Sequence, residues 1–171
     1  MQQSIFHSLF SSTERLVFRE LEETDADWLF EIYSDKEAMK YRGSVPLQNR
    51  MEAIEMVRNV IKQTSQINAY RLGIVVKPGL SLIGTVLYKT HTSNTEICEI
   101  GFSLDKNHWG KGYATELVSS MLINFKKQKE FKELHAWVVK ENSSSVRLFE
   151  KLGFHIQTQN QYPHSFLFVY K

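Results

Sequence analysis

The sequence predicts a single α/β domain built around one mixed β-sheet. Its 171 residues, of which 42% are apolar and 23% charged, are typical of one globular domain. Segments with the composition of strands gather in the middle of the chain and then alternate with segments of helical periodicity. The predicted order is β α α β β β α β α β β, or about seven strands flanked by about four helices. Because only the later part alternates, the sheet is expected to be mixed.

The first half of the chain predicts a strand, two helices and an antiparallel meander of three strands. Thr24 to Asp27 has the residue types of a helix start, and apolar residues at helical spacing follow it. Pro78-Gly79 and Thr92-Ser93-Asn94 separate segments rich in Val, Ile, Leu and Tyr, which indicates turns between strands. The expected elements are a strand at 16–20, a helix after Thr24, a helix over 47–61, and strands at 70–77, 82–90 and 96–104.

The second half predicts two helices and three strands. Apolar residues recur at helical spacing from Ala114 to Phe125, which indicates a long amphipathic helix. A second, shorter helix is expected between Asn142, an N-cap type, and Gly153, a C′ type. The expected strands are 135–139, then 154–158 and 164–170 around a turn at Pro163. We expect residues 1–13 to form a loose leader and residues 14–171 the folded domain.

Composition excludes several classes of function. A net charge of +2 argues against a polybasic nucleic-acid clamp, and no apolar run approaches the roughly 20 residues of a membrane span. Cys98 is the single cysteine, so neither an intrachain disulfide nor a cage of several thiolates around zinc can form, and it is interpreted as a core residue. We therefore expect a cytoplasmic protein with no metal and no nucleic-acid or membrane partner.

The charge is unevenly distributed along the chain. Residues 14–37 contain nine acidic and three basic side chains, whereas residues 38–171 contain 18 basic and 10 acidic ones. One interpretation is a solvated acidic face on an early helix. The other is that the acidic segment borders a site for a cationic substrate while the rest of the chain holds an anionic one.

The turn between the third meander strand and the long helix has the features of an anion site. Gly110 and Gly112 allow the backbone to turn tightly, and the free N–H groups of the following helix start attract an anion. No acid precedes Glu116 in this helix, and Lys111 adds a cation. The spacing matches neither a P-loop nor the dinucleotide fingerprint. A glycine turn that merely begins a helix is the alternative.

Together these segments resemble the GNAT superfamily of acetyl-CoA-dependent N-acetyltransferases. The resemblance rests on residues 98–104 (CEIGFSL), 109–116 (WGKGYATE), and 142–145 (NSSS) through Gly153-Phe154, in that order and at the family's spacing. The opening segment 15–19 (RLVFR), followed by 24–26 (TDA), is similar to the branch that acetylates ribosomal-protein N-termini, the ribosomal-protein-alanine acetyltransferases. The resemblance extends over nearly the whole chain from about residue 14.

The resemblance implies a binding site for acetyl-CoA. The pyrophosphate would bind the glycine turn, although Trp109 stands where the family has Gln or Arg, and the pantetheine arm would pair with a strand edge where two strands splay apart. The implied cofactor-binding residues are Phe102, Ser103, Leu104, Trp109, Gly110, Lys111, Gly112, Tyr113, Ala114 and Asn142. Trp28, Tyr33, Tyr41 and Arg42 lie in the part that shapes the acceptor cleft in this family, and each is interpreted first as a packing residue.

The resemblance also implies direct transfer from the thioester to a neutral amine. Glu99 stands where some relatives have a carboxylate base and could act through a water, or it could be an ion-pair partner. Phe149 replaces the Tyr whose hydroxyl protonates the leaving thiolate in many relatives. Ser145, one turn earlier, is the nearest substitute, unless it is an ordinary residue of the helix start. A backbone N–H of strand residues 102–104 would hold the oxyanion.

The expected activity is acetylation of a primary amine, with the α-amine of a protein N-terminus as the leading acceptor. Small amines such as polyamines, amino acids or aminoglycosides remain open. A non-catalytic acyl-CoA-binding module and a nucleotide-binding protein are alternatives from other classes. A homodimer is compatible with the sequence, but nothing in it predicts one.

Overall fold

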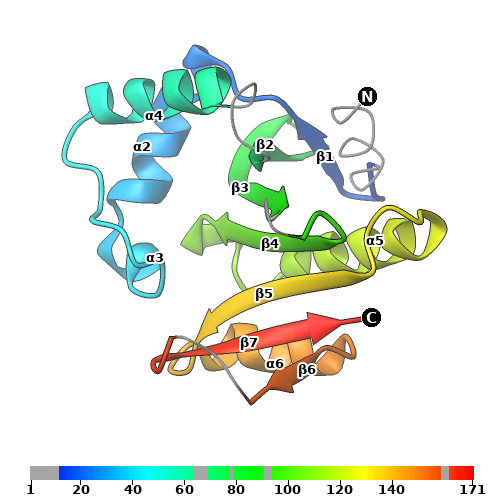
Figure 1. The fold of residues 1–171 in the computed structure, drawn as a ribbon. Helices are drawn as coiled ribbons and strands as arrows, with labels where there is room; N and C mark the ends of the chain where they lie inside the picture. Colours follow the sequence, from blue (N-terminus) through cyan, green and yellow to red (C-terminus); the bar gives the residue numbers. More distant parts are fainter. Residues whose placement is uncertain (1–11, 64–68, 78, 91–93, 159–161) are drawn as a thin grey trace.

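The computed structural model describes residues 12–63, 69–77, 79–90, 94–158 and 162–171. Within them the chain forms one seven-stranded sheet and five α-helices (Figure 1). The strands are β1 (Leu16–Arg19), β2 (Ala69–Val76), β3 (Ser81–Thr90), β4 (Ile97–Leu104), β5 (Glu133–Val139), β6 (His155–Gln157) and β7 (Ser165–Tyr170). The α-helices are α2 (Ala26–Ser34), α3 (Lys36–Met39), α4 (Arg50–Gln63), α5 (Tyr113–Lys127) and α6 (Ser143–Lys151), and two 3-10 helices are η1 (Glu23–Asp25) and η2 (Lys106–His108).

The strands lie in the order β1-β2-β3-β4-β5-β7-β6. Only β4 and β5 are parallel; the other described neighbours are antiparallel. The register places Arg71 opposite Leu87 and Leu87 opposite Gly101. Since directly opposite residues point to the same side of a sheet, these three positions share one face.

Helices cover both faces of the sheet, and each face has its own apolar core. On the α5–α6 face, Leu117 of α5 and Phe149 of α6 belong to a cluster with Ile83. On the α2–α4 face, Tyr33 of α2 belongs to a cluster with Leu82. The adjacent residues Leu82 and Ile83 fall in different cores, as the alternation of side chains along a strand requires.

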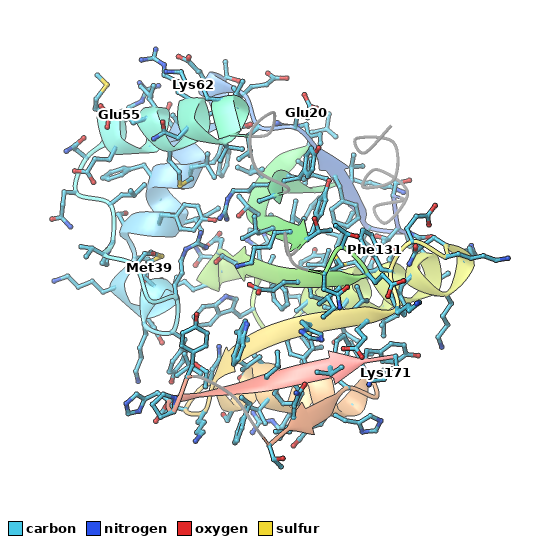
Figure 2. All side chains as sticks on the ribbon, in the orientation of Figure 1. Glu20, Met39, Glu55, Lys62, Phe131 and Lys171 are labelled. Carbon is cyan, nitrogen blue, oxygen red and sulfur yellow. The ribbon has the colours of Figure 1, made fainter. Side chains whose placement is uncertain are left out.

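The helix α4 shows why the first half folds onto the sheet as it does. Ala53 and Val57 are fully buried on one side of this helix. Glu55 and Lys62 are exposed and point away from the sheet (Figure 2). This amphipathic pattern fixes which side of α4 packs on α2 and the sheet.

The parallel pair β4–β5 is joined over only three residues of each strand. Pairing runs from Ile97 with Glu133 to Glu99 with His135 and then stops. Beyond it, β4 stays paired with β3 as far as Leu104, and β5 stays paired with β7 as far as Val139. The facing edges of β4 and β5 therefore separate and leave backbone groups without a strand partner.

The fold predicted from the sequence is confirmed, with differences at its start. The helix predicted after Thr24 begins as the 3-10 helix η1 and continues as α2. The Asp25 carboxylate accepts a hydrogen bond from the Glu22 N–H at 2.8 Å. A short helix, α3, forms where no element was predicted. The Asp35 carboxylate caps it by accepting from two backbone N–H groups of that helix, both at 2.9 Å. Strand bounds differ by one or two residues.

The helix caps predicted from residue types are also present. Asn142 caps α6 by accepting from the Ser145 N–H at 3.2 Å, and Gly153 ends it with a φ of +84°. The expected turn residues Pro78, Thr92 and Ser93, and residues 1–11 of the expected leader, lie outside the described part of the chain.

Candidate functional site

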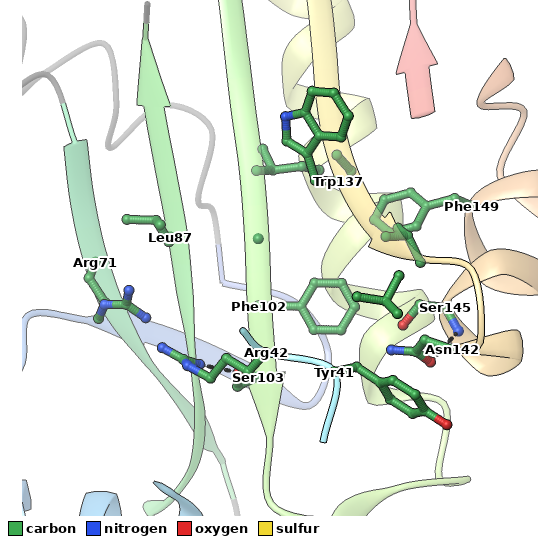
Figure 3. A pocket seen from close by; sticks show the side chains of 15 residues that line it. Tyr41, Arg42, Arg71, Leu87, Phe102, Ser103, Trp137, Asn142, Ser145 and Phe149 are labelled. Atoms are coloured by element: carbon green, nitrogen blue, oxygen red, sulfur yellow. Dashed lines mark hydrogen bonds between the residues drawn. The ribbon is translucent and has the colours of Figure 1, made fainter. Parts of the chain in front are cut away.

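The opening between β4 and β5 forms a pocket of about 290 Å³ (Figure 3). Its walls come from the two separated strand ends, from the start of α6 and from the segment that follows α3. The lining residues are Tyr41, Arg42, Arg71, Leu87, Ile100, Gly101, Phe102, Ser103, Ala136, Trp137, Val138, Val139, Asn142, Ser145 and Phe149. Seven residues that were singled out from the sequence therefore meet here: Tyr41, Arg42, Phe102, Ser103, Asn142, Ser145 and Phe149.

The α6 wall of the pocket is partly polar and partly aromatic. The Asn142 side-chain oxygen is occupied by the Ser145 N–H, which leaves its amide nitrogen for a ligand. Phe149 is 3% exposed and packs against Phe154 and Phe168, with ring centroids 4.9 and 5.5 Å away. A phenyl ring in this place supplies shape but no proton.

The glycine turn has the backbone conformation of an anion-binding helix start. Gly110 and Gly112 have φ values of +73° and +82°, in the left-handed region that other residues adopt at a cost. Gly112 is the N-cap of α5 and contributes no side-chain acceptor, so the first N–H groups of the helix stay available. With Lys111 exposed beside them, these groups fit a phosphate.

Arg15 supports this turn, a role that the sequence analysis did not assign. Its guanidinium pairs with Glu116, Nε to Oε2, at 2.6 Å and donates to the Lys111 carbonyl oxygen at 3.0 Å. Thr13 also donates to the Glu116 carboxylate. The one acid in the first turn of α5 is thereby neutralised and held by the segment just before β1. The segment 15–19 was interpreted as the start of a strand and as the basis of the branch resemblance, neither of which gives Arg15 a role at the turn.

Trp109 shows how the unusual first residue of the turn is accommodated. Its indole Nε1–H donates to the Leu104 carbonyl oxygen at 2.9 Å, so the side chain ties the turn to the end of β4. The indole remains 45% exposed. Trp109 thus acts as a brace, and the two glycines keep the geometry that an anion needs.

Glu99 lies at the closed end of the opening. It occupies the last paired position of β4, opposite His135, and does not line the pocket. Its carboxylate pairs with the Lys89 ammonium at 3.0 Å, and its side chain is 16% exposed. Any contact between this carboxylate and an amine in the pocket would need a bridging water.

The α2–α4 face of the pocket contains two arginines. Arg42 donates to the Ser103 hydroxyl and stacks on the Tyr33 ring, with its Cζ 4.1 Å from the centroid. Arg71 donates to the Thr85 hydroxyl at 3.0 Å. Arg71 was missed from the sequence, although a lone charge between Tyr70 and Leu72 in an apolar strand was a usable signal.

Two further observations bear on the sequence expectations. Burial raises the pKa of the Cys98 thiol to about 12, which agrees with its interpretation as a core residue. The acidic segment 14–37 contributes no residue to the pocket lining. Four of its acids instead form ion pairs, Asp25 with Arg19, Glu23 with Arg58, Asp27 with Arg50 and Asp35 with Lys106.

A sheet that opens between its parallel strands, beside an anion-binding helix start, is the architecture of an acyl-CoA-dependent transferase. Residues 15–155 match the family described as acetyltransferase (GNAT) domain. The chain is also 33% identical over 142 residues to the uncharacterized N-acetyltransferase p20 of Bacillus licheniformis, a match covering 83% of this chain and 80% of that protein. The chain belongs to the GNAT family and is an N-acetyltransferase by that membership.

Solved structures agree on the fold. A GNAT-family acetyltransferase from Bacillus anthracis superposes with a TM-score of 0.79 at 22% identity, covering 94% of this chain and 97% of that one. RimL, a ribosomal-protein α-N-acetyltransferase solved with coenzyme A, superposes with a TM-score of 0.75 at 14% identity, covering 94% and 96%. Proteins of this fold bind acetyl-CoA.

No helix in the described part of the chain is both long and apolar enough to cross a membrane. Those same residues contain no group of three His, Cys, Asp or Glu side chains that could hold a metal ion.

Proposed function

We propose that the protein transfers the acetyl group of acetyl-CoA directly to the α-amine of a protein N-terminus. The observation that carries the proposal is the pocket between the separated edges of β4 and β5, close in the chain to the glycine turn. In the reaction the amine nitrogen bonds to the thioester carbonyl carbon and the carbon–sulfur bond breaks. The amine loses a proton, and the departing thiolate gains one.

The residues proposed to bind acetyl-CoA fit its two parts. Gly110, Lys111, Gly112, Tyr113 and Ala114 would hold the pyrophosphate, with Trp109 bracing the turn. The open edge of β4 at Phe102, Ser103 and Leu104 would pair with the amides of the pantetheine arm, and the amide nitrogen of Asn142 would donate to it.

The reaction requires the protein to position the amine and the thioester and to transfer two protons. We assign Glu99 as the base, acting through a water, and Ser145 as the acid that protonates the thiolate. The buried, protonated Cys98 thiol agrees with direct transfer that uses no enzyme-bound intermediate. A reducing cytoplasm is the proposed setting, because the chain has a single cysteine.

Two observations support an N-terminal α-amine as acceptor. The segment 15–19 is similar to the ribosomal-protein branch, and RimL, which shares the fold, is named for that activity. An α-amine with a pKa of about 7.7–8.0 is roughly a tenth neutral at pH 7, so a base that acts only through water suffices. The small pocket volume favours a second candidate, a small primary amine.

The test is an acceptor panel. Thiol release from acetyl-CoA is measured with N-terminal peptides, a lysine ε-amine peptide, polyamines, amino acids and aminoglycosides, and coenzyme A binding is measured by calorimetry. Faster release with α-amine peptides than with the other amines is the expected result. Tight coenzyme A binding without release for any amine would instead identify an acyl-CoA-binding module, and binding of ATP or NAD without coenzyme A would overturn the proposal.

A further inference from the structure

Two guanidinium groups lie in the pocket without an acidic partner among the described residues. Arg42 comes from the segment after α3 and Arg71 from β2, and their side chains extend toward one another across the α2–α4 face (Figure 3). Their partners among the described residues are neutral: the Ser103 hydroxyl, the Tyr33 ring and the Thr85 hydroxyl.

The charges of the two arginines shift the pKa values of neighbouring groups. Burial lowers the pKa of Arg42, and the neighbouring charge of Arg71 lowers it further, whereas Tyr33 opposes the shift. Burial raises the pKa of Tyr33, but the charges of Arg42 and Arg71 outweigh it, so the phenol pKa lies below its ordinary value. Tyr33 and Arg42 thus lie in an excess of positive charge that an anion would neutralise.

The pyrophosphate of acetyl-CoA does not account for this charge. Its proposed site is the glycine turn, which shares no residue with the pocket lining and has its own cation, Lys111. Leu87 and Gly101 lie on the same face of the sheet as Arg71. The space beside Gly101 on this face is open, because a Cβ added at Gly101 would meet nothing within 4 Å. The arginines therefore face the side of the opening on which an acceptor has room.

We propose that Arg42 and Arg71 bind an anionic group, a carboxylate or a phosphate, carried on the same molecule as the acceptor amine. The enzyme then favours anionic acceptors over neutral ones and discriminates against polyamines and aminoglycosides. Planar guanidinium groups suit both anions because they donate two parallel hydrogen bonds. This proposal rests on the proposed function, since it describes the acceptor of the same reaction.

The experiment compares kcat/KM for matched acceptors. One pair is an amidated tetrapeptide with Asp in its second position and the same peptide with Asn; the other is phosphoethanolamine and ethanolamine. Spermidine is the cationic member. We expect at least about a tenfold preference for the anionic member of one pair, and that pair identifies carboxylate or phosphate as the group bound.

Variants connect the preference to the two arginines. Arg71→Gln is expected to bring the anionic-to-neutral ratio close to one, and Arg71→Lys to retain part of it, with coenzyme A affinity and thermal unfolding close to wild type. Arg42→Gln should act in the same direction. Arg58→Gln is the matched control, because this exposed arginine pairs with Glu23 outside the pocket, and the ratio should not change.

A binding measurement separates this proposal from the proposed function. The N-acetylated Asp and Asn peptides are titrated into the protein saturated with coenzyme A, for wild type and Arg71→Gln. Thiol release without any charge preference would overturn the anion site and leave the acetyltransferase assignment intact. Charge-dependent peptide binding that Arg71→Gln removes, without thiol release for any amine, would support the anion site and contradict the proposed function.

Discussion

At the scale of single residues, Glu99 has two interpretations, a general base and an ion-pair partner. It lies where β4 and β5 part, and it also pairs with Lys89. An ion-pair role and a base role predict different consequences of removing the carboxylate, so a neutral isostere decides between them.

Glu99→Gln is expected to lower kcat by about a hundredfold for an ε-amine acceptor, the usual order of a general-base contribution. The loss should be smaller for an α-amine, because far more of that amine is already neutral at pH 7. Steady-state kinetics against pH provide the measurement, and coenzyme A affinity should stay constant. Lys89→Gln is the control, since it breaks the same ion pair and leaves the carboxylate. If both variants have the wild-type pH profile, Glu99 is not the base.

The Ser145 hydroxyl can be removed without disturbing the start of α6. The Asn142 cap uses the Ser145 backbone N–H, so Ser145→Ala removes the hydroxyl and keeps the helix start. We expect kcat to fall by about tenfold, within the range for a positioned proton donor, with unchanged thermal unfolding. Phe149→Tyr in the Ser145→Ala background should recover part of the rate, because Phe149 lines the same pocket. A wild-type kcat for Ser145→Ala would assign the proton to water.

At the scale of elements, the start of α5 combines a left-handed N-cap with an uncrowded set of N–H donors. Asn and Asp tolerate the left-handed region equally well, so Gly112→Asn and Gly112→Asp share the backbone cost and differ in charge. The aspartate variant is expected to bind coenzyme A about tenfold more weakly than the asparagine variant, because an anion at a helix start competes with phosphate. Calorimetry measures the difference, and equal affinities would move the phosphate site away from this turn.

At the scale of the whole molecule, the pair Arg15–Glu116 connects the segment just before β1 to the helix that begins after the turn. Burial raises the pKa of Glu116, but hydrogen bonds from Thr13 and Arg15 outweigh it and hold that pKa below its ordinary value. A carboxylate of this kind adds stability above its unfolded pKa of about 4.3, and the stability is lost as pH falls through the lower folded pKa.

Arg15→Gln is therefore expected to reduce the free energy of unfolding at pH 7 by roughly 1 kcal/mol, after allowance for solvent screening of the half-exposed guanidinium. The effect should be smaller at pH 3 than at pH 7, because the unfolded carboxylate is protonated below about 4.3 and the folded one only as pH falls through its lower pKa. Urea unfolding at the two pH values measures both numbers. Arg58→Gln, which breaks an exposed pair, is the control that should change little at either pH. An equal cost of Arg15→Gln at both pH values would show that the guanidinium stabilises by packing alone.

The overall architecture was predictable because its signals are local and repeated. Two local patterns indicate helices independently of the rest of the fold: the apolar spacing of α5, and the caps of α6 at Asn142 and Gly153. The helix α3 was not predictable, because four residues contain no periodicity and its Asp35 cap resembles any polar loop residue.

The site was predictable only in part. The residues of the glycine turn and of the α6 start were found because their backbone roles require glycines and capping residues, which can be recognised in a sequence. The position of Glu99 at the closed end depends on where the β4–β5 pairing stops, which is a property of the assembled sheet. Arg71 and Arg42 are distant in sequence. The register of β2, β3 and β4 places Arg71 at the pocket, and the path of the chain after α3 brings Arg42 to it.

The short pairing of β4 with β5 has a consequence for the sheet when acetyl-CoA binds. The sheet consists of a four-stranded and a three-stranded block, connected edge to edge through three residues of each strand. On the proposed placement, the pantetheine arm fills the missing ladder and completes the sheet as a surrogate strand. Coenzyme A binding would then protect backbone amides of β4 from hydrogen exchange. Release of the product coenzyme would expose these amides to solvent again in every catalytic cycle.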